Sequence, residues 1–255
     1  MIDLTIKDGI AEIVLNAPRK LNALNEEALA ELSQAYDDAA VPGVRALLLR
    51  GEGRVFCAGR NISDVDPAND DAYAFLAERV TPLMQKIAGF PAPTFAAAHG
   101  ACLGVGLGLL VATDVVYVSE NAKIGSPFAN LGATLDSGGH WLFTERLGVH
   151  RALDLIYTGD LMSGAEAVAA GLFSRAFPAD DLLKRTREIV ARVAIGAVGA
   201  MRVSKVLVAE IRDFRIGLWD AMDHESKAQG VLSGTKDYAE GFAAFAEKRR
   251  PVFTG

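Results

Sequence analysis

Hydrophobic and polar residues alternate along residues 2–7 and 10–15, and the dipeptide Asp8-Gly9 lies between these two segments. Alternation with a period of two predicts strands with one buried face, and Asp-Gly is typical of a tight hairpin turn. Unbroken apolar runs predict three further buried strands later in the chain. These runs cover residues 44–49, 93–98 and 114–119.

Segments with helical spacing separate the predicted strands. Leu29, Leu32 and Tyr36 recur three or four residues apart, in a helix that Asn25 is expected to cap. A second helix is predicted from about residue 70 to 87, and a glycine-rich turn with a short apolar helix precedes the last buried strand. Strands that alternate with helices predict an α/β core with parallel strand pairing.

Strand signals stop near Ala179, and the remaining pattern is helical. We therefore predict a core formed by residues 1–195 and a helical C-terminal region formed by residues 196–255, which acts as a lid or an assembly surface. The predicted helices in this part of the chain span residues 180–193, 197–211, 215–229 and 235–246.

The composition is that of an ordinary globular protein, with 51% apolar and 23% charged residues among 255. A net charge of −6 makes nucleic acid an unsuitable partner, because phosphates are bound by basic surfaces. The longest apolar stretch, residues 105–112, is much shorter than a membrane span, and the N-terminus lacks the pattern of a secretory signal. We expect a cytoplasmic protein, without a membrane partner, in which Cys57 and Cys102 are reduced core residues.

Two glycine-bearing segments, residues 56–61 and 100–108, each follow a predicted strand. Small residues at such turns let backbone N–H groups approach a ligand, and in the second segment these groups lie at a helix N-terminus. Two such donors form an oxyanion hole, which stabilises a carbonyl oxygen as it gains charge. Close packing alone also explains the glycines, whereas a dinucleotide site is disfavoured because Gly104-x-Gly106-x-Gly108 lacks the G-x-G-x-x-G spacing.

Six motifs resemble those of the crotonase (enoyl-CoA hydratase/isomerase) family and occur in the family's usual order. The resemblance implies a spiral of βαβ units, and trimers or dimers of trimers that pack through the C-terminal helices. It also implies an acyl-CoA thioester substrate, with coenzyme A as part of that substrate and with no metal or redox cofactor. The motifs are APRKLNALN (17–25), VFCAGRNI (55–62), PAPTFAAAHGACLGVGLGLLVATDVV (91–116), LGATLDSGGHWLFTERLG (131–148), YTGDLMSGAEAVAAGL (157–172) and YAEGFAAFAEKRRPVF (238–253).

The resemblance also carries over site residues, position by position. The oxyanion donors implied in this way are the N–H groups of Ala58 and Val105. Arg19 and Lys20 match positions near the CoA phosphates. The other implied contacts are Ala23 and Leu24 along the pantetheine, Phe245 and Lys248 toward a CoA held by a neighbouring subunit, and Gly59, Arg60, Asn61, Gly104, Phe128 and Trp141 around the substrate.

The sequence departs from the family's hydratases at both of their catalytic glutamates, whose positions hold Gly108 and Phe128 here. Hydration needs a carboxylate pair to activate water and to protonate carbon, so efficient hydration is not expected. The remaining acid is Asp136, in a segment that resembles that of 2-(1,2-epoxyphenyl)acetyl-CoA isomerases. Asp136 is therefore predicted to move the proton; the alternative is that it only caps the helix beginning near Gly138.

Several other polar or aromatic residues are predicted to have supporting roles. His99 is expected to form a structural hydrogen bond beside the second glycine turn, and Trp141 to line the acyl pocket or to lie in the core. Asp64 and Asp66 are interpreted as solvated loop residues.

The function predicted from these observations is an acyl-CoA isomerase that shifts a double bond or a ring through a thioester enolate. Four alternatives stay open. They are a hydratase or lyase, a dehalogenase with Asp136 as nucleophile and Phe128 at an aromatic wall, a non-catalytic acyl-CoA-binding protein, and a nicotinamide oxidoreductase.

Overall fold

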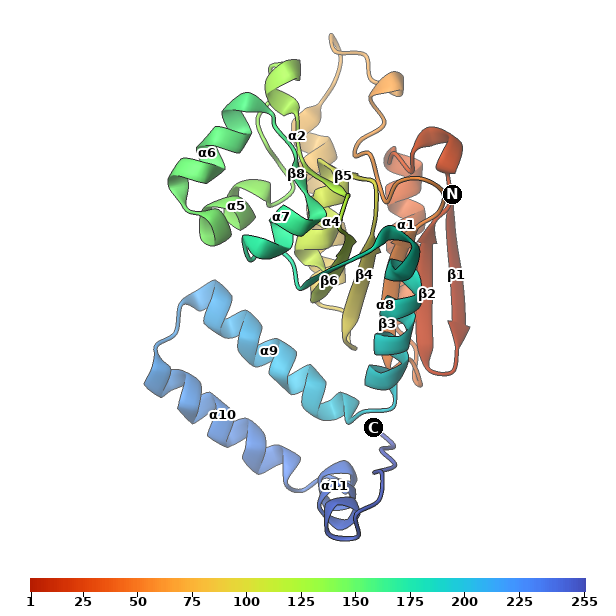
Figure 1. The fold of residues 1–255 in the computed structure, drawn as a ribbon, viewed down its shortest axis with the longest axis vertical. Helices are drawn as coiled ribbons and strands as arrows, with labels where there is room; N and C mark the ends of the chain where they lie inside the picture. The colour runs from red at the N-terminus through yellow and green to blue at the C-terminus, as the bar shows by residue number, and fades with distance from the viewer.

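The computed structural model describes the backbone of all 255 residues and every side chain except that of Asp64. Its centre is a six-stranded sheet with the order β1-β2-β3-β4-β6-β9 (Figure 1). β1 and β2 pair antiparallel, and the other neighbouring strands of this sheet pair parallel. The strands are β1 (Ile2–Lys7), β2 (Ile10–Leu15), β3 (Ala46–Gly51), β4 (Thr94–Ala98), β6 (Val115–Ser119) and β9 (Arg175–Phe177).

The predicted N-terminal hairpin is confirmed at the level of register. Lys7 lies opposite Ile10, so Asp8 and Gly9 form the turn. Both turn residues have positive φ, 52° for Asp8 and 75° for Gly9, which the short side chain of Asp and the absent side chain of Gly allow.

Both faces of the central sheet are covered. In β3, Leu47 and Leu49 belong to the larger core cluster, whereas Ala46 and Leu48 pack toward α8 (Ala179–Ala194). Because successive residues of a strand point to opposite faces, a strand buried on both sides has the unbroken apolar pattern seen here. The larger cluster also contains residues of α1 (Glu26–Ala39), α3 (Thr81–Ala88) and α4 (Val105–Ala112).

The helix predicted between residues 70 and 87 is divided into three consecutive segments. α2 (Ala72–Ala74) is capped by Asp71 and leads into a π-helical segment, η3 (Phe75–Val80), which continues into α3. The π segment buries Phe75 and Val80 against the core. A π segment widens the helix locally, and such segments often occur near functional sites.

A second, three-stranded sheet joins β5 (Ala101–Leu103), β7 (Lys123–Gly125) and β8 (Met162–Ser163). An isolated bridge pairs Cys57 with Cys102, and both thiols are free and fully buried, which confirms them as core residues. Burial raises the pKa of Cys57 to about 12. Two helices lie between β7 and β8 in the chain, α5 (Gly139–Leu147) and α6 (Val149–Thr158), and α7 (Gly164–Ala169) follows β8.

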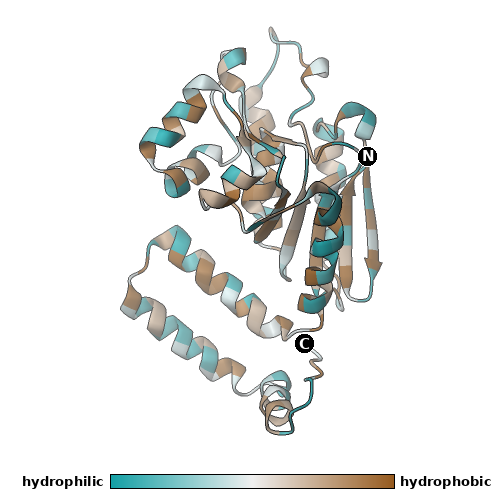
Figure 2. Ribbon diagram, in the orientation of Figure 1, coloured by the Kyte–Doolittle hydropathy of each residue, from teal (hydrophilic) through white to brown (hydrophobic). Residues whose placement is uncertain are grey.

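The C-terminal residues form a helical layer that extends away from the sheet (Figure 1). Its helices are α9 (Val198–Phe214), α10 (Leu218–Leu232) and α11 (Lys236–Ala246), as predicted for this part of the chain. Figure 2 shows hydrophobic residues along these helices, and several of the largest are exposed: Val208, Phe214, Trp219, Val231, Phe242 and Phe245.

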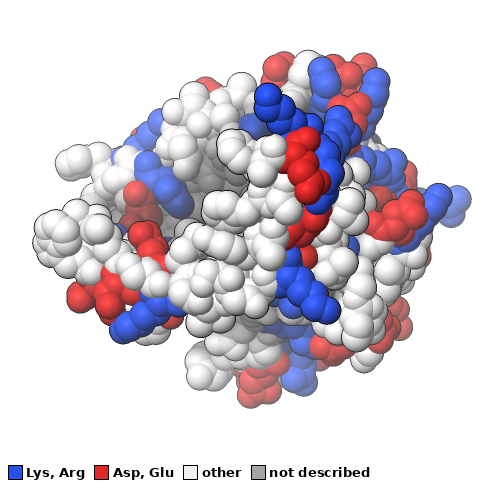
Figure 3. Space-filling view, turned by 90° about the horizontal axis from the view of Figure 1, so that it is seen from below, with Lys and Arg blue, Asp and Glu red and all other residues white. Residues whose placement is uncertain are grey.

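Lys and Arg lie beside Asp and Glu over the face of the molecule seen from the side of α11, and uncharged residues cover much of its centre (Figure 3). Among the helices of the described chain, none is long and apolar enough to cross a membrane.

Candidate active site

The two glycine turns predicted from the sequence lie against each other. Gly59 and Gly104 have positive φ, 98° and 53°. A Cβ on Gly59 would lie 2.9 Å from Leu103 O, and a Cβ on Gly104 would lie 3.9 Å from Gly59 Cα. Any side chain at Gly59 would therefore push the two turns apart. The glycines bring two stretches of backbone to one place.

The backbone pairing around the first turn decides which N–H group is available to a ligand. Ala58 N donates to Leu21 O at 3.0 Å, so the donor that the resemblance implied at Ala58 is already occupied. Leu24 N donates to Gly59 O, and Asn61 N donates to Leu24 O, each at 2.8 Å. In this parallel bridge the N–H of Arg60 points away from Leu24. The prediction of Ala58 as first donor is therefore wrong, and Arg60 N is the candidate in its place.

The second candidate donor is the N–H of Val105, the first residue of α4. The first N–H groups of a helix have no partner within the helix, and they carry its positive partial charge. Among the described residues, neither Arg60 N nor Val105 N has a hydrogen-bond acceptor. Each donor directly follows one of the two touching glycines. This arrangement fits an oxyanion hole.

The side chain of Arg60 is held within the protein. Its guanidinium donates two hydrogen bonds to Asp70, at 2.9 and 2.6 Å, and lies 4.0 Å from the ring centroid of Phe75. Asn61 accepts a hydrogen bond from Ser63 N at 3.2 Å and caps the short helix η2 (Ile62–Asp64). The guanidinium of Arg60 is thus engaged within the protein, and its backbone N–H is the group that is free to bind a ligand. The Arg60 side chain also joins the loop after the first turn to Phe75 of η3.

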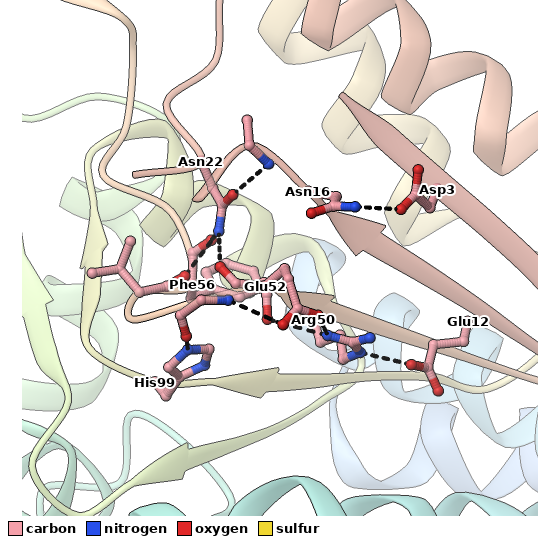
Figure 4. A network of polar contacts seen from close by, with 12 residues as sticks. Asp3, Glu12, Asn16, Asn22, Arg50, Glu52, Phe56 and His99 are labelled. Atoms are coloured by element: carbon pink, nitrogen blue, oxygen red, sulfur yellow. Dashed lines mark hydrogen bonds and ion pairs between the residues drawn. The ribbon is translucent and has the colours of Figure 1, made fainter. Parts of the chain in front are cut away.

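Asn22 is a structural residue of the site to which the sequence assigned no role. Its side chain is 1% exposed and donates to Glu52 O and Val55 O, each at 2.9 Å (Figure 4). Its Oδ1 accepts a hydrogen bond from Ala17 N at 2.9 Å. Its place inside APRKLNALN was the signal available in the sequence. Asn22 joins the segment before α1 to the segment before the first glycine turn.

His99 has the supporting role predicted for it. Its Nε2 lies 2.8 Å from Gly53 O, and its own carbonyl accepts a hydrogen bond from Phe56 N at 2.7 Å (Figure 4). Asp66 is exposed and hydrogen-bonded within its own loop, to Asn69 Nδ2 at 2.6 Å, as expected for a solvated residue. The corresponding prediction for Asp64 falls on a side chain outside those described.

Asp136 lies just before α5 but does not cap it. The N-cap residue of α5 is Gly138, and no side chain makes a capping hydrogen bond there. Ser137 and Gly138 both have positive φ, 54° and 82°, so the chain turns sharply after Asp136. The side chain of Asp136 therefore does not cap α5, although its backbone carbonyl accepts a hydrogen bond from Gly139 N at 2.9 Å.

The carboxyl group of Asp136 is half-buried and incompletely satisfied. Its Oδ1 is inaccessible to solvent and has no hydrogen-bond partner among the described residues. Burial raises the pKa of Asp136, while the nearby Ser137 side chain, Arg60 and His140 act in the opposite direction. A buried carboxyl with a raised pKa and a free oxygen is suited to proton transfer.

The positions of the two missing glutamates are filled by other groups. A Cβ on Gly108 would lie 2.5 Å from Ser137 Cβ and would contact Met84 Cε. Phe128 belongs to η4 (Phe128–Leu131), and its Cζ would lie 3.0 Å from a Cβ on Gly104. The wall beside the two turns thus consists of Phe128, Ser137 and Met84. It holds no carboxylate at either position.

The remaining implied contacts are distributed over two parts of the molecule. Leu24 is bridged to Arg60, which places Ala23 and Leu24 beside the first turn. Arg19 and Lys20 are exposed on η1 (Pro18–Lys20). Trp141 is 39% exposed, with the Arg212 guanidinium 5.7 Å from its ring centroid, so it is not a core residue. Phe245, at the end of α11, is 85% exposed, and Lys248 follows it in the C-terminal layer rather than at the turns.

Comparison with known proteins agrees with this fold. The family model described as enoyl-CoA hydratase/isomerase matches residues 5–255. The probable enoyl-CoA hydratase echA8 of Mycobacterium bovis is 36% identical over 245 residues, 95% of this chain and 93% of that protein. The putative enoyl-CoA hydratase/isomerase YhaR of Bacillus subtilis is 34% identical over 246 residues, 96% and 95% of the two chains.

Solved structures give the same result. The enoyl-CoA hydratase of Bacillus anthracis superimposes with a TM-score of 0.92 at 29% identity, over 100% of this chain and 99% of that chain. The α/β fold is thus the crotonase fold, with its C-terminal helical region. The chain belongs to the enoyl-CoA hydratase/isomerase family, and it is an acyl-CoA enzyme of that family.

Proposed function

We propose that this enzyme is an acyl-CoA isomerase, which moves a double bond or opens or shifts a ring in the acyl group. The observation that carries the proposal is the carboxyl of Asp136, whose buried Oδ1 has no partner among the described residues and whose pKa is raised by burial. Groups of this kind occur where a proton is taken up and released. The substrate brings coenzyme A with it, and no metal or redox cofactor enters the proposal.

In the proposed reaction, the thioester oxygen accepts hydrogen bonds from Arg60 N and Val105 N. Asp136 removes a proton from the acyl chain, and the negative charge moves to the thioester oxygen as an enolate. The two N–H groups stabilise this charge, because they are fixed in place before the reaction begins. Asp136 then returns the proton at another carbon, which leaves the bond order rearranged and the composition unchanged.

An isomerase fits the wall of the site better than a hydratase does. Hydration requires one group to activate water and another to protonate carbon. Gly108 and Phe128 supply neither, and the space beside Gly108 is taken by Ser137 and Met84. The relatives that share this fold are named enoyl-CoA hydratases or hydratase/isomerases, so the proposed difference from a hydratase lies in these side chains.

The CoA part of the substrate is assigned to the surface beside the first turn. Arg19 and Lys20 would pair with the phosphates, and Ala23 and Leu24 would run along the pantetheine. Phe245 and Lys248 would complete the CoA site of a neighbouring subunit in a cytoplasmic homotrimer or dimer of trimers. Exposed apolar residues on α9 and α10, such as Phe214 and Trp219, support burial of this layer in an assembly.

Asp136→Asn tests the proposal, with Asp66→Asn as the matched control on an exposed loop. Turnover of 3-enoyl-CoA and of epoxyphenylacetyl-CoA is measured together with exchange of substrate protons for solvent deuterium. Asp136→Asn is expected to lower both by roughly 100-fold or more and to change acyl-CoA affinity only a few-fold. Unchanged deuterium exchange in Asp136→Asn would remove Asp136 from the mechanism.

Dehalogenation is the second candidate, because Phe128 presents an aromatic ring above Gly104. In that reaction Asp136 would attack the ring of a halobenzoyl-CoA as a nucleophile. Halide release from 4-chlorobenzoyl-CoA, abolished by Asp136→Asn, would favour this candidate over the isomerase.

A further inference from the structure

An apolar pocket of about 450 Å³ lies behind the loop that carries Asp136. Its walls come from η3 and α3, from the second half of α4, from the turn before α5 and the start of that helix, and from the end of α9. The volume falls in the range of small-molecule sites, roughly 300–1,000 Å³. The apolar residues that line it are Leu76, Val80, Met84, Ala88, Val111, Ala112 and Trp141.

Helix α4 connects this pocket to the oxyanion hole. Val105 is its first residue, and Val111, in the pocket wall, lies about 9 Å further along the axis at roughly 1.5 Å per residue. Gly108 lies between them. An extended chain advances roughly 1.2 Å per bond, so an acyl group of about eight carbons, with its carbonyl at Val105 N, reaches the pocket.

Met84 stands at the boundary between the two spaces. Its Cε is the atom that a side chain on Gly108 would meet first, and the other contacts there are the Cβ and backbone oxygen of Ser137. The backbone of Ser137 is fixed by its turn, whereas methionine is unbranched and can change rotamer at low cost. Met84 is therefore the movable part of this wall.

On the side formed by α9, the pocket is lined by a pair of opposite charges. Arg212 donates to Asp213 through two hydrogen bonds, at 2.7 and 2.9 Å, and its guanidinium lies over Trp141. Among the described residues that line the pocket, Arg212 and Asp213 are the charged ones, and they neutralise each other. The pocket offers no unpaired charge to a distal carboxylate. An uncharged, apolar end group suits it.

From these contacts we infer that the pocket binds the distal part of a long or aromatic apolar acyl group, and that Met84 controls entry to it. The substrates are then CoA esters with an apolar chain or ring beyond the reacting carbons, rather than short or dicarboxylic ones. The placement of the thioester rests on the proposed function. Occupation of the pocket is tested by binding alone, which requires no turnover.

The test measures the affinity of the full-length protein for saturated butanoyl-, hexanoyl-, octanoyl- and decanoyl-CoA by calorimetry. In the wild type, affinity is expected to rise by about fourfold per buried methylene up to octanoyl-CoA. Val111→Trp fills the pocket, so it should weaken octanoyl-CoA by at least about tenfold and leave butanoyl-CoA within about twofold. Val41→Trp, the same change at an exposed residue outside the pocket, should have no effect on either.

A second pair of variants tests the gate independently of Val111. Met84→Ala should favour decanoyl-CoA over butanoyl-CoA more strongly than the wild type does, and Met84→Phe should reverse that preference. Equal effects on short and long esters in both Met84 and Val111 variants would overturn the inference. A second result would also overturn the inference: Val111→Trp changes the sedimentation coefficient but not the chain-length preference. That result would mean that a second copy of the chain, and not the acyl group, covers the pocket.

The same titrations on Asp136→Asn separate the two proposals. If this variant keeps the chain-length preference and also keeps deuterium exchange, the proposed function fails while the pocket assignment stands. If it loses exchange, and the Val111 and Met84 variants leave the preference unchanged, the pocket assignment fails alone.

Discussion

Ser137 occupies the space that a side chain on Gly108 would need: a Cβ placed on Gly108 lies 2.5 Å from Ser137 Cβ and 2.8 Å from Ser137 O. Gly108→Ala is therefore expected to lower the free energy of unfolding by about 1–3 kcal/mol, because the turn after Asp136 cannot yield without moving α5. Urea denaturation measures this. For the same reason, Gly108→Glu should not restore hydration of crotonyl-CoA, because its side chain would meet Ser137.

Gly230 provides the matched control, since a Cβ placed there on α10 meets nothing within 4 Å. Gly230→Ala is expected to stabilise the helix by up to about 1 kcal/mol. An equally stable Gly108→Ala would contradict the close approach of Ser137.

The pH dependence of turnover follows from the direction of the Asp136 pKa shift. Burial raises this pKa above the ordinary value of 3.8. A carboxylate that acts as the base loses activity as pH falls through its own pKa, so the acid limb of kcat/KM should lie above 3.8. A pH profile of isomerisation checks this, and an acid limb at or below that value would contradict it.

The contribution of Asp136 to folding stability should fall as pH rises, whereas its activity as a base increases. Because the folded protein holds the Asp136 proton more tightly than the unfolded chain does, the contribution of this group to stability falls as pH rises from 3.8 through the folded-state pKa. Asp136→Asn removes the buried charge, so the variant should be more stable than the wild type at neutral pH. Near about pH 3 the two should unfold alike. Urea denaturation at both pH values measures the difference.

Asn22 should be among the costliest polar residues to replace. Asn22→Ala leaves the carbonyls of Glu52 and Val55 without their donor, and it places Ala at a φ of 53°. A loss of about 2–4 kcal/mol of unfolding free energy is expected, together with reduced turnover. Asn16→Ala, which removes one exposed hydrogen bond to Asp3, should cost less than about 0.5 kcal/mol. Equal losses in the two variants would show that burial of Asn22 is unimportant.

Assembly is tested by two aromatic residues of similar exposure. Trp219 on α10 is 77% exposed, and Tyr73 on α2 is 79% exposed. If the C-terminal layer joins subunits, Trp219→Glu should dissociate a trimer or hexamer in sedimentation velocity, because a buried charge without a partner is costly. Tyr73→Glu should leave the assembly intact. A wild-type protein that sediments as an active monomer would refute the proposed trimer.

The sequence predicts those parts of the fold that depend on neighbouring residues. The hairpin at Asp8-Gly9 and the cap of α1 by Asn25 are local devices, and both are confirmed. The π-helical segment Phe75–Val80 has no such signal, because its wider turn is set by packing against the core. The helix from residue 70 was therefore predicted without this interruption.

The sequence placed the first candidate oxyanion donor at Ala58, two residues before Arg60, whose N–H the structure leaves free. In Phe56-Cys57-Ala58-Gly59-Arg60, every residue has an N–H. The sequence does not show which of these N–H groups forms a hydrogen bond within the protein. Pairing with Leu21 occupies that of Ala58, and pairing with Leu24 leaves that of Arg60 free. Both partners lie more than thirty residues earlier in the chain. The distinction is a tertiary one.

The clamp of Arg60 by Asp70 and Phe75 changes how a mutational scan of this site would be interpreted. Every replacement except proline preserves the N–H at position 60, so the donor of the proposed hydrogen bond to the thioester is still present. An inactive Arg60→Ala enzyme would suggest a cation that binds substrate, although the guanidinium is engaged elsewhere. Asp70→Asn separates the two explanations, since it loosens the tether and leaves the positive charge in place.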